Sequence, residues 1–423
     1  MNPPVGTLSD TAAAVSMFSI LLAPLALAGL ALVNTGLGRS RSAAHAMLAS
    51  LSVVGVAVLV YFVCGFSWQG YAGSPAHVFL AGGRPWNWIA AQPWFLRGIE
   101  WNGSAPSLIV LLQLFSVGLA ALIPLGAGAD RWRLASACVS TALLAGVMYP
   151  LFAHWAWAGG WLAQLGYVDA GGSGSIQAVG GLSALSIAWT LGPRRGKYTA
   201  EGMPAAIPAH NTVLVLFACF LAWIGWMGLN GAGAILLAGA PAGSIVLAAV
   251  NTSLAATGAG LAAAAITRFR FGRPDASLCA NGWIGGLVAS SAGCVFLAPA
   301  AAALTGLVAG ALVVFSVEWL DVYLEIDDPG GAIPVHALGG LWGLLATGLF
   351  SRGGRIPLLP QIVGIGTLLG FVLPAIHGYH WVLDRIYPQR VSAEGERQGM
   401  DLHELGAGAY PEFVIHREDF GQR

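Results

Sequence analysis

Asp169-Ala-Gly-Gly-Ser-Gly-Ser-Ile-Gln-Ala-Val-Gly-Gly-Leu-Ser-Ala-Leu185 is the stretch that decides the fold, because the pattern that begins at Gln177 returns 159 residues later. The second copy is His336-Ala-Leu-Gly-Gly-Leu-Trp-Gly-Leu344, so each copy places one hydrogen-bonding side chain just before Gly-Gly-Leu. Transporters built from two related halves have their substrate path at the repeat interface, near the bilayer midplane. Gln177 and His336 are therefore the first candidates for its lining, although Gly-Gly-Leu can recur by chance among 59 glycines.

The composition predicts a chain that lives in a lipid bilayer. Hydrophobic residues make up 57% and charged residues 9% of the chain, whereas an ordinary soluble domain has about 25% charged residues. The net charge is zero and Lys197 is the one lysine, which argues against nucleic-acid binding. The five cysteines lie singly in apolar surroundings without the spacing of metal ligands. We expect no metal, no cofactor and no enzymatic activity.

Eleven stretches are long and apolar enough to cross a hydrocarbon core of about 30 Å, which takes about 20 residues. We predict an all-α polytopic membrane protein with an inverted repeat of five plus five helices and one extra helix. An odd number of helices in each half inverts the second copy, so Gln177 and His336 can face each other near the centre. The predicted helices lie at approximately 10–36, 43–66, 106–129, 134–156, 173–192, 209–231, 243–268, 276–295, 298–320, 333–351 and 356–386.

The distribution of basic residues predicts the orientation. With the N-terminus outside, the first four inside loops hold ten basic residues and the outside loops hold four. The positive-inside rule then favours a cell-membrane protein with its N-terminus outside and its C-terminus in the cytoplasm. We expect residues 1–386 to form the transmembrane domain, with the last helix outside the repeat. Residues 387–423 lack a spanning run and are predicted to form a cytoplasmic tail.

Asp169 lies at the outside end of the bundle, just ahead of the fifth predicted helix, and two interpretations of it are compatible. A carboxylate at the edge of a bilayer-embedded bundle is costly unless it pairs, caps a helix or binds a cation. As a cap, it would organise the glycine-rich turn that follows. As part of a pore mouth, its negative charge would attract a small cation that a nearby indole face can hold.

Several motifs together resemble the ammonium transporter, methylamine permease and Rhesus family. Asp169 to Gly181 is similar to its Asp-Phe-Ala-Gly-Ser-Gly-x-x-His-x-x-Gly-Gly signature. The likeness extends over nearly the whole chain and identifies a bacterial-type member with altered pore residues. The other matching segments are Ser9-Asp-Thr-Ala12, Ala129-Asp-Arg131, His210-Asn211, Gly225-Trp-Met-Gly-Leu-Asn230, Asp327-Asp-Pro329, Val335-His-Ala-Leu-Gly-Gly340 and Met400 to Tyr410.

The resemblance implies a homotrimer in which each protomer holds a narrow, mostly hydrophobic pore. Carried over to this sequence, Trp157 and Asp169 match the outer site that recruits ammonium, and His336 matches the second pore histidine. The departures are in the pore. Gln177 replaces the first pore histidine, Leu229 and Ser116 stand at the two phenylalanine gate positions, and Gly233 replaces an outer serine. Gln177 cannot take up a proton, so a histidine relay would be interrupted.

The sequence therefore predicts ammonium or ammonia transport through a pore in each protomer. A non-conducting ammonium receptor that signals through its C-terminal tail is the alternative, and passage of another small neutral solute through the altered gate is a third. The resemblance also implies a possible cytoplasmic partner, a trimeric regulatory protein of the PII type. Besides that protein and the other copies of the chain, the expected partner is membrane lipid.

Overall fold

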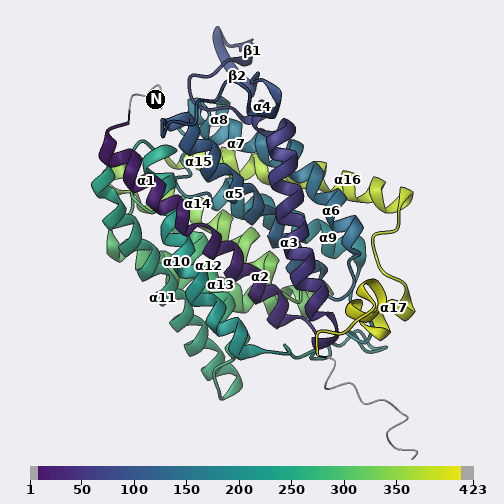
Figure 1. The fold of residues 1–423 in the computed structure, drawn as a ribbon. Coiled ribbons are helices and arrows are strands. Elements are labelled where there is room, and N and C mark those ends of the chain that lie inside the picture. The colour runs from purple at the N-terminus through teal and green to yellow at the C-terminus, as the bar shows by residue number, and fades with distance from the viewer. Residues whose placement is uncertain (1–7, 411–423) are drawn as a thin grey trace, which may run out of the picture.

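The helical segments predicted from the sequence recur, with shifts of a few residues, in a computed structural model that describes residues 8–410. Some of the predicted helices are interrupted by a proline or by a wide π-helical turn. Each of these corresponds to two consecutive α-helices in the structure (Figure 1). In order they are α1 and α2 (Asp10–Leu22, Pro24–Leu37), α3 and α4 (Ala43–Val60, Phe66–Gln69), α5 (Ala105–Gly128), α6 and α7 (Leu134–Leu143, Tyr149–Trp157), α9 (Val179–Leu191), α10 (Thr212–Leu236), α11 (Ile245–Phe271), α12 (Ala276–Ser291), α13 (Pro299–Tyr323), α14 (Gly339–Phe350), and α15 and α16 (Leu358–Thr367, Leu373–Ile386).

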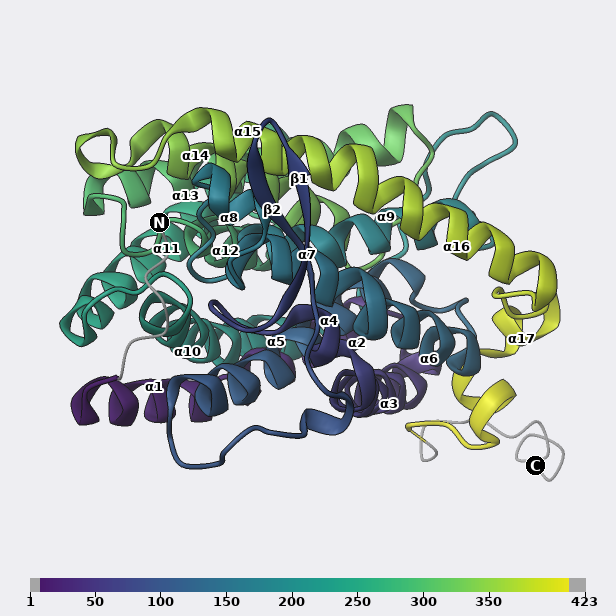
Figure 2. The same cartoon turned by 90° about the horizontal axis from the view of Figure 1, so that it is seen from above.

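Nine helical segments within residues 8–410 are long and apolar enough to cross a membrane by themselves. The segments that contain α9 and α12 are not among the nine, although both occupy predicted positions. Most residues of these two helices are buried by neighbouring helices, 10 of 13 in α9 and 11 of 16 in α12. A helix whose surface is mostly covered by other helices does not need a continuous apolar surface, so α9 and α12 can be rich in glycine and serine. The long α15–α16 helix instead runs along the edge of the bundle (Figure 2).

The two halves meet where the segment containing α9 crosses the segment containing α14. A Cβ added at Gly181 would collide with the backbone nitrogen of Ala337, and one added at Gly340 would lie 3.0 Å from the backbone nitrogen of Ala178. Ala337 lies 159 residues after Ala178, as Gly340 does after Gly181. The contacts are therefore reciprocal, as a two-fold relation between inverted halves requires.

The predicted repeat is longer than the pattern that first revealed it. Asp169-Ala-Gly-Gly172 and Asp328-Pro-Gly-Gly331 are also 159 residues apart. The last glycine of each has a positive φ, 90° at Gly172 and 66° at Gly331, which favours glycine. A wide π-helical turn follows in each half, at Ser173–Ala178 and at Ile333–Leu338.

Buried salt bridges hold the loops together at the end of the bundle opposite the start of α1. The Arg194 guanidinium donates to both carboxylate oxygens of Asp327, at 2.9 and 3.0 Å, and to Asp130 at 2.9 Å. Arg131 donates to the carbonyl oxygens of Asp327 at 2.8 Å and Gly192 at 2.7 Å. Burial by itself would raise the pKa of Asp327, but the hydrogen bonds and charges of Arg194 and Arg131 keep that pKa below its ordinary value. These contacts join both halves of the chain.

A β-hairpin, β1 (Ala76–Ala81) with β2 (Arg84–Ala90), is a departure from the all-α prediction. It projects from the end of the bundle near the start of α1 (Figure 1). The Trp155 indole N–H donates to the carbonyl oxygen of Trp88 at 2.7 Å, and the two rings lie 4.9 Å apart, so the hairpin is fastened to α7. Gly82-Gly83 between two strand-forming runs is the sequence signal that could have predicted it.

The predicted tail is packed against the bundle as far as the structure describes it. It contains α17 (Ala393–Gln398) and a turn at Asp401–Leu405, on the opposite end from the hairpin (Figure 1). The Asp401 carboxylate accepts from the backbone N–H of His45 at 2.7 Å, and Glu404 lies 2.9 Å from the His45 ring nitrogen Nε2. Residues 411–423 of the tail lie outside the described residues.

The helix crossing makes a testable prediction about stability. Replacing Gly181 or Gly340 with valine pushes a side chain into the backbone of the partner segment, and overpacking of a tight interior costs about 1–3 kcal/mol. We expect a lower thermal unfolding midpoint for each variant in detergent. Gly366→Val is the matched control, because a Cβ at this helical position meets no atom within 4 Å. Equal midpoints for all three variants would contradict the close crossing.

Candidate functional site

Gln177 and His336 form a hydrogen-bonded pair at the crossing of the two halves. The His336 ring nitrogen Nδ1 and the Gln177 amide oxygen Oε1 are 2.7 Å apart. Both side chains are buried, with exposed fractions of 0% for Gln177 and 2% for His336. Each lies in a π-helical turn one helical turn before its Gly-Gly pair, so the same glycines that let the backbones approach also bring these two side chains together.

The orientation of the pair determines its chemistry. With the amide oxygen of Gln177 facing the ring, Nδ1 of His336 carries a hydrogen and donates it, which leaves Nε2 as a proton acceptor. The Gln177 amide nitrogen Nε2 has no hydrogen-bond partner among the described residues. The pair therefore offers a mobile species one base and one neutral amide donor. Only the base can exchange a proton.

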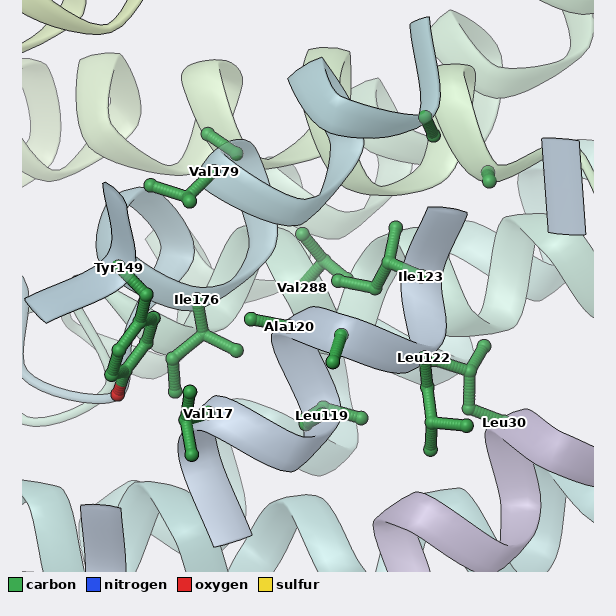
Figure 3. Packing of buried hydrophobic residues seen from close by; sticks show 14 of the residues in the cluster. Leu30, Val117, Leu119, Ala120, Leu122, Ile123, Tyr149, Ile176, Val179 and Val288 are labelled. Atoms are coloured by element: carbon green, nitrogen blue, oxygen red, sulfur yellow. The ribbon is translucent and has the colours of Figure 1, made fainter. Parts of the chain in front are cut away.

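The sequence neighbours of Gln177 belong to a cluster of buried hydrophobic residues, the apolar wall, part of which Figure 3 shows. Ile176, the residue before it, is buried and lies near Val117 of α5 and Tyr149 of α7 in this view. One helical turn later, Gly180 lets α5 approach, since an added Cβ would lie 2.8 Å from the carbonyl oxygen of Ala120. The hydrogen-bonding pair is thus set in surroundings that would exclude most water.

Asp169 caps the segment that carries Gln177. Its carboxylate oxygen Oδ2 accepts from the backbone N–H groups of Gly174 at 3.1 Å and Ser175 at 2.8 Å, and from the Ser175 hydroxyl at 2.9 Å. The capping interpretation from the sequence is therefore confirmed. The second oxygen, Oδ1, is buried without a partner in residues 8–410, so part of the carboxylate is available to a donor.

Trp157 lies beside Asp169, as the resemblance implies. Its indole N–H donates to the carbonyl oxygen of Asp169 at 2.7 Å. Both residues line a small pocket together with Tyr167, Leu237 and Phe296. Because the indole N–H is already engaged, what Trp157 has to offer a cation is the face of its ring.

Gly233, at the position where the resemblance implies an outer serine, has no room for a side chain. A side chain at this position would collide with the carbonyl oxygen of Ala170. That loop is fixed, because the backbone N–H groups of Ala170 and Gly171 donate to carbonyl oxygens at the end of α12, at 3.1 and 2.8 Å. The loop backbone occupies the space that a serine would need.

The two predicted gate positions are buried but lack large aromatic side chains. Ser116 on α5 donates its hydroxyl to the Leu112 carbonyl oxygen at 2.9 Å, within its own helix. Leu229 on α10 packs in the apolar core. No hydrogen bond between described residues joins Ser116 to Gln177 or His336. The sequence did not reveal that Tyr149 would donate to the side chain of Gln113, one turn before Ser116.

Asp328, which the sequence marks only as part of a family motif, is the counterpart of Asp169 in the second half. Its two carboxylate oxygens accept from the backbone N–H groups of Ala332 at 3.1 Å and Ile333 at 2.7 Å. It therefore caps the segment of His336 as Asp169 caps that of Gln177, eight residues before the pore side chain in each half. The 159-residue offset was the signal that could have found it. The part of the chain that the structure describes contains no cluster of potential metal ligands.

Comparisons with known proteins show which sequences this chain resembles. The model of the Ammonium Transporter Family matches residues 13–410. The ammonium transporter Amt2 of Archaeoglobus fulgidus is 34% identical over 421 residues, which cover 92% of this chain and 85% of that protein. The ammonium transporter Amt2 of Haloferax mediterranei is 31% identical to this chain. The aligned residues cover 94% of this chain and 89% of that protein.

Solved structures have the same fold. A structure described as a sensor Amt protein superimposes with a TM-score of 0.86 at 27% identity, over 93% of this chain and 98% of that one. Mep2 of Candida albicans has a TM-score of 0.81 over 96% and 91% of the two chains, and at 24% identity it supports the fold alone.

Two substitutions at Asp169 separate its role as a cap from its charge. Asp169→Asn keeps an oxygen that can accept from Ser175, whereas Asp169→Ala removes the cap, which typically costs about 0.5–2 kcal/mol. We expect the thermal unfolding midpoint of Asp169→Ala to fall below that of Asp169→Asn. The two variants should bind ammonium equally weakly if the charge recruits the cation. Parent-like binding by Asp169→Asn would show that the charge is not needed.

Proposed function

This chain belongs to the ammonium transporter family, and from that premise we propose that it moves ammonium or ammonia across a membrane through a narrow passage in each chain. It is a multi-pass membrane protein. The observation that supports the passage most directly is the buried pair of Gln177 and His336 at the interface of the two inverted halves.

The proposed cycle begins at the pocket that Trp157 and Asp169 line. The free oxygen Oδ1 of Asp169 and the indole face of Trp157 attract ammonium, which has both a positive charge and hydrogens to donate. Potassium is similar in size but donates no hydrogen bond. This difference gives a site built from acceptors a basis for selection.

The apolar wall beyond that pocket sets the next step. An ion that leaves water for a low-dielectric interior loses a large solvation free energy. Neutral ammonia avoids most of this loss, so deprotonation before the passage lowers the barrier. Nε2 of His336 can accept a hydrogen bond from ammonia and Nε2 of Gln177 can donate one to it, so together they replace part of its hydration shell.

Gln177 restricts how the proton can travel. A relay through two imidazoles passes a proton from ring to ring, whereas an amide neither takes up nor releases a proton near neutral pH. We therefore propose weaker selectivity, or a different coupling of proton movement, than a pair of histidines would give. The small Ser116 and aliphatic Leu229 at the gate positions act in the same direction, because they close the passage with less bulk than aromatic rings.

The orientation and assembly belong to the same proposal. Ten basic residues lie in the loops predicted on the same side as the tail, and four lie in the loops on the opposite side. This difference supports an outside N-terminus and a cytoplasmic C-terminus. Residues 1–386 would then form the transporter domain and 387–423 a cytoplasmic tail. We propose a homotrimer embedded in lipid, with the tail face open to a regulatory protein of the PII type.

A second function is favoured by one comparison. The structural relative at TM-score 0.86 is described as a sensor, and this chain has lost a titratable group in its central pair. A receptor would bind ammonium at Trp157 and Asp169 and signal through the tail, which is packed on the bundle by Asp401 and Glu404. Such a protein would bind ammonium and pass little of it.

Currents on a supported membrane after an ammonium jump distinguish the two functions. We expect a current for the parent and a decrease of at least about 10-fold for His336→Ala, because the base of the central pair is lost. His77→Gln on the exposed hairpin is the control and should match the parent. Ammonium binding without a current would favour the receptor, and absence of both would contradict both functions.

A further variant tests the role of Gln177. Gln177→His restores a second base beside His336, so we expect a larger ammonium current and a smaller potassium leak in liposomes. Identical currents and leak in the parent and the variant would show that the amide does not control proton movement.

A further inference from the structure

A basic pocket opens between three segments at the end of the bundle that carries α17. Its volume is about 490 Å³. The loop after α2, the loop after α9 and α17 itself contribute its walls, although they are more than 150 residues apart in the sequence. Four guanidinium groups line it against two carboxylates, and the residues are Arg39, Arg41, Arg195, Glu394, Glu396 and Arg397.

Both carboxylates are already engaged within the protein. Glu396 accepts from the backbone N–H of Arg195 at 2.6 Å and from the Arg390 guanidinium at 2.7 Å. Glu394 pairs with Arg397 on the same short helix and accepts from Gln398 at 3.0 Å. They therefore have little capacity left to neutralise the other arginines of the pocket.

Three of the lining arginines have no counter-charge closer than 3.8 Å in residues 8–410, and two of them, Arg41 and Arg195, are exposed. Within residues 8–410 the side chains of Arg41 and Arg195 make no salt bridge or hydrogen bond, and Arg39 has only a long contact of 3.8 Å with Asp130. Arg41 cannot simply swing away at its base, because Gly399 of the tail, at φ 100°, packs against its Cβ and Cγ. Burial lowers the pKa of Arg39, and the charges of Arg194 and Arg41 lower it further, although the charge of Asp130 opposes them.

We propose that this pocket binds a phosphate group and thereby fastens α17 to the loops after α2 and α9. Guanidinium groups bind phosphate oxygens through paired, charge-assisted hydrogen bonds, which suits them for this anion. A phosphate dianion also matches the excess of two positive charges in the lining. The anion can come from a soluble phosphate or from the headgroup of an anionic phospholipid in the adjacent leaflet.

A phosphate bound in the pocket would be linked to the transmembrane helices through residues next to the pocket, Arg194 and Arg390. Arg195 follows Arg194, whose guanidinium holds Asp327 and Asp130. Arg390, which binds Glu396, also donates to the Leu191 carbonyl oxygen at the end of α9, at 2.7 Å. A bound phosphate therefore stabilises the docked tail next to the loop that leads to Asp328 and His336. This inference goes beyond the proposed function, and it can be tested without ammonium.

Hydrogen–deuterium exchange of residues 393–405 in the purified full chain provides the test. We expect inorganic phosphate to slow exchange there, with a half-maximal concentration at least about 10-fold higher for Arg41→Gln/Arg195→Gln. Arg268→Gln/Arg273→Gln removes the same charge from the end of α11 and should respond as the parent does. The single variants Arg41→Gln and Arg195→Gln, checked for an unchanged elution volume, replace the double variant if it fails to fold.

Nanodiscs distinguish the two sources of phosphate. In phosphate-free buffer, slower exchange in phosphatidylcholine discs with phosphatidate than in discs without it identifies the lipid, whereas an effect of inorganic phosphate alone identifies a soluble anion. The proposal is wrong if neither slows exchange in the parent, or if the double variant responds as the parent does. It is also wrong if removal of residues 411–423 accelerates exchange while phosphate leaves the parent unchanged, because the occupant would then be the chain's own C-terminal segment.

Discussion

The close crossing of two helices at Gly181 and Gly340 is the constraint on which the rest of the structure depends. Lipid provides no hydrophobic drive between helices, so tight packing of small residues has to supply the attraction. Here the approach is close enough that each glycine lies against the backbone of the other half. This close approach places Gln177 and His336, one helical turn before the glycines, within hydrogen-bond distance of each other in the interior of the bundle.

Only 9% of the residues are charged, and the carboxylates inside the bundle either cap backbone N–H groups or pair with arginines. Asp169 and Asp328 satisfy backbone N–H groups at the starts of the two central segments, which would otherwise be left unpaired inside the bundle. Asp327 and Asp130 are instead paired with arginines, because a buried charge without a counter-charge would be strongly destabilising. The central segments are thus fixed in place before any substrate arrives.

Symmetry of the backbone does not impose symmetry of chemistry. The two halves share their caps, their π-helical turns and their glycine pairs, yet one presents an amide and the other an imidazole. Of the two side chains, only the imidazole of His336 can take up and release a proton. The outer pocket is altered in a related way, because the loop backbone at Ala170 fills the space opposite Gly233. These local changes leave the shared fold intact. The selectivity of this protein therefore depends on its own pore residues and does not follow from the fold of its family.

The sequence by itself determined the order and approximate positions of the helical segments, the inverted halves and the two residues that form the central pair. Hydropathy identifies most of the segments that cross the membrane, and the offset of 159 residues between related side chains identifies the two halves. It did not determine the hairpin that β1 and β2 form, the packing of the tail, the Tyr149–Gln113 contact or the basic pocket beside α17. Those features join segments that are distant along the chain or lack a strong periodic pattern. Only the tertiary structure decided them, because the burial and pairing of a polar group depend on which neighbours the fold brings to it.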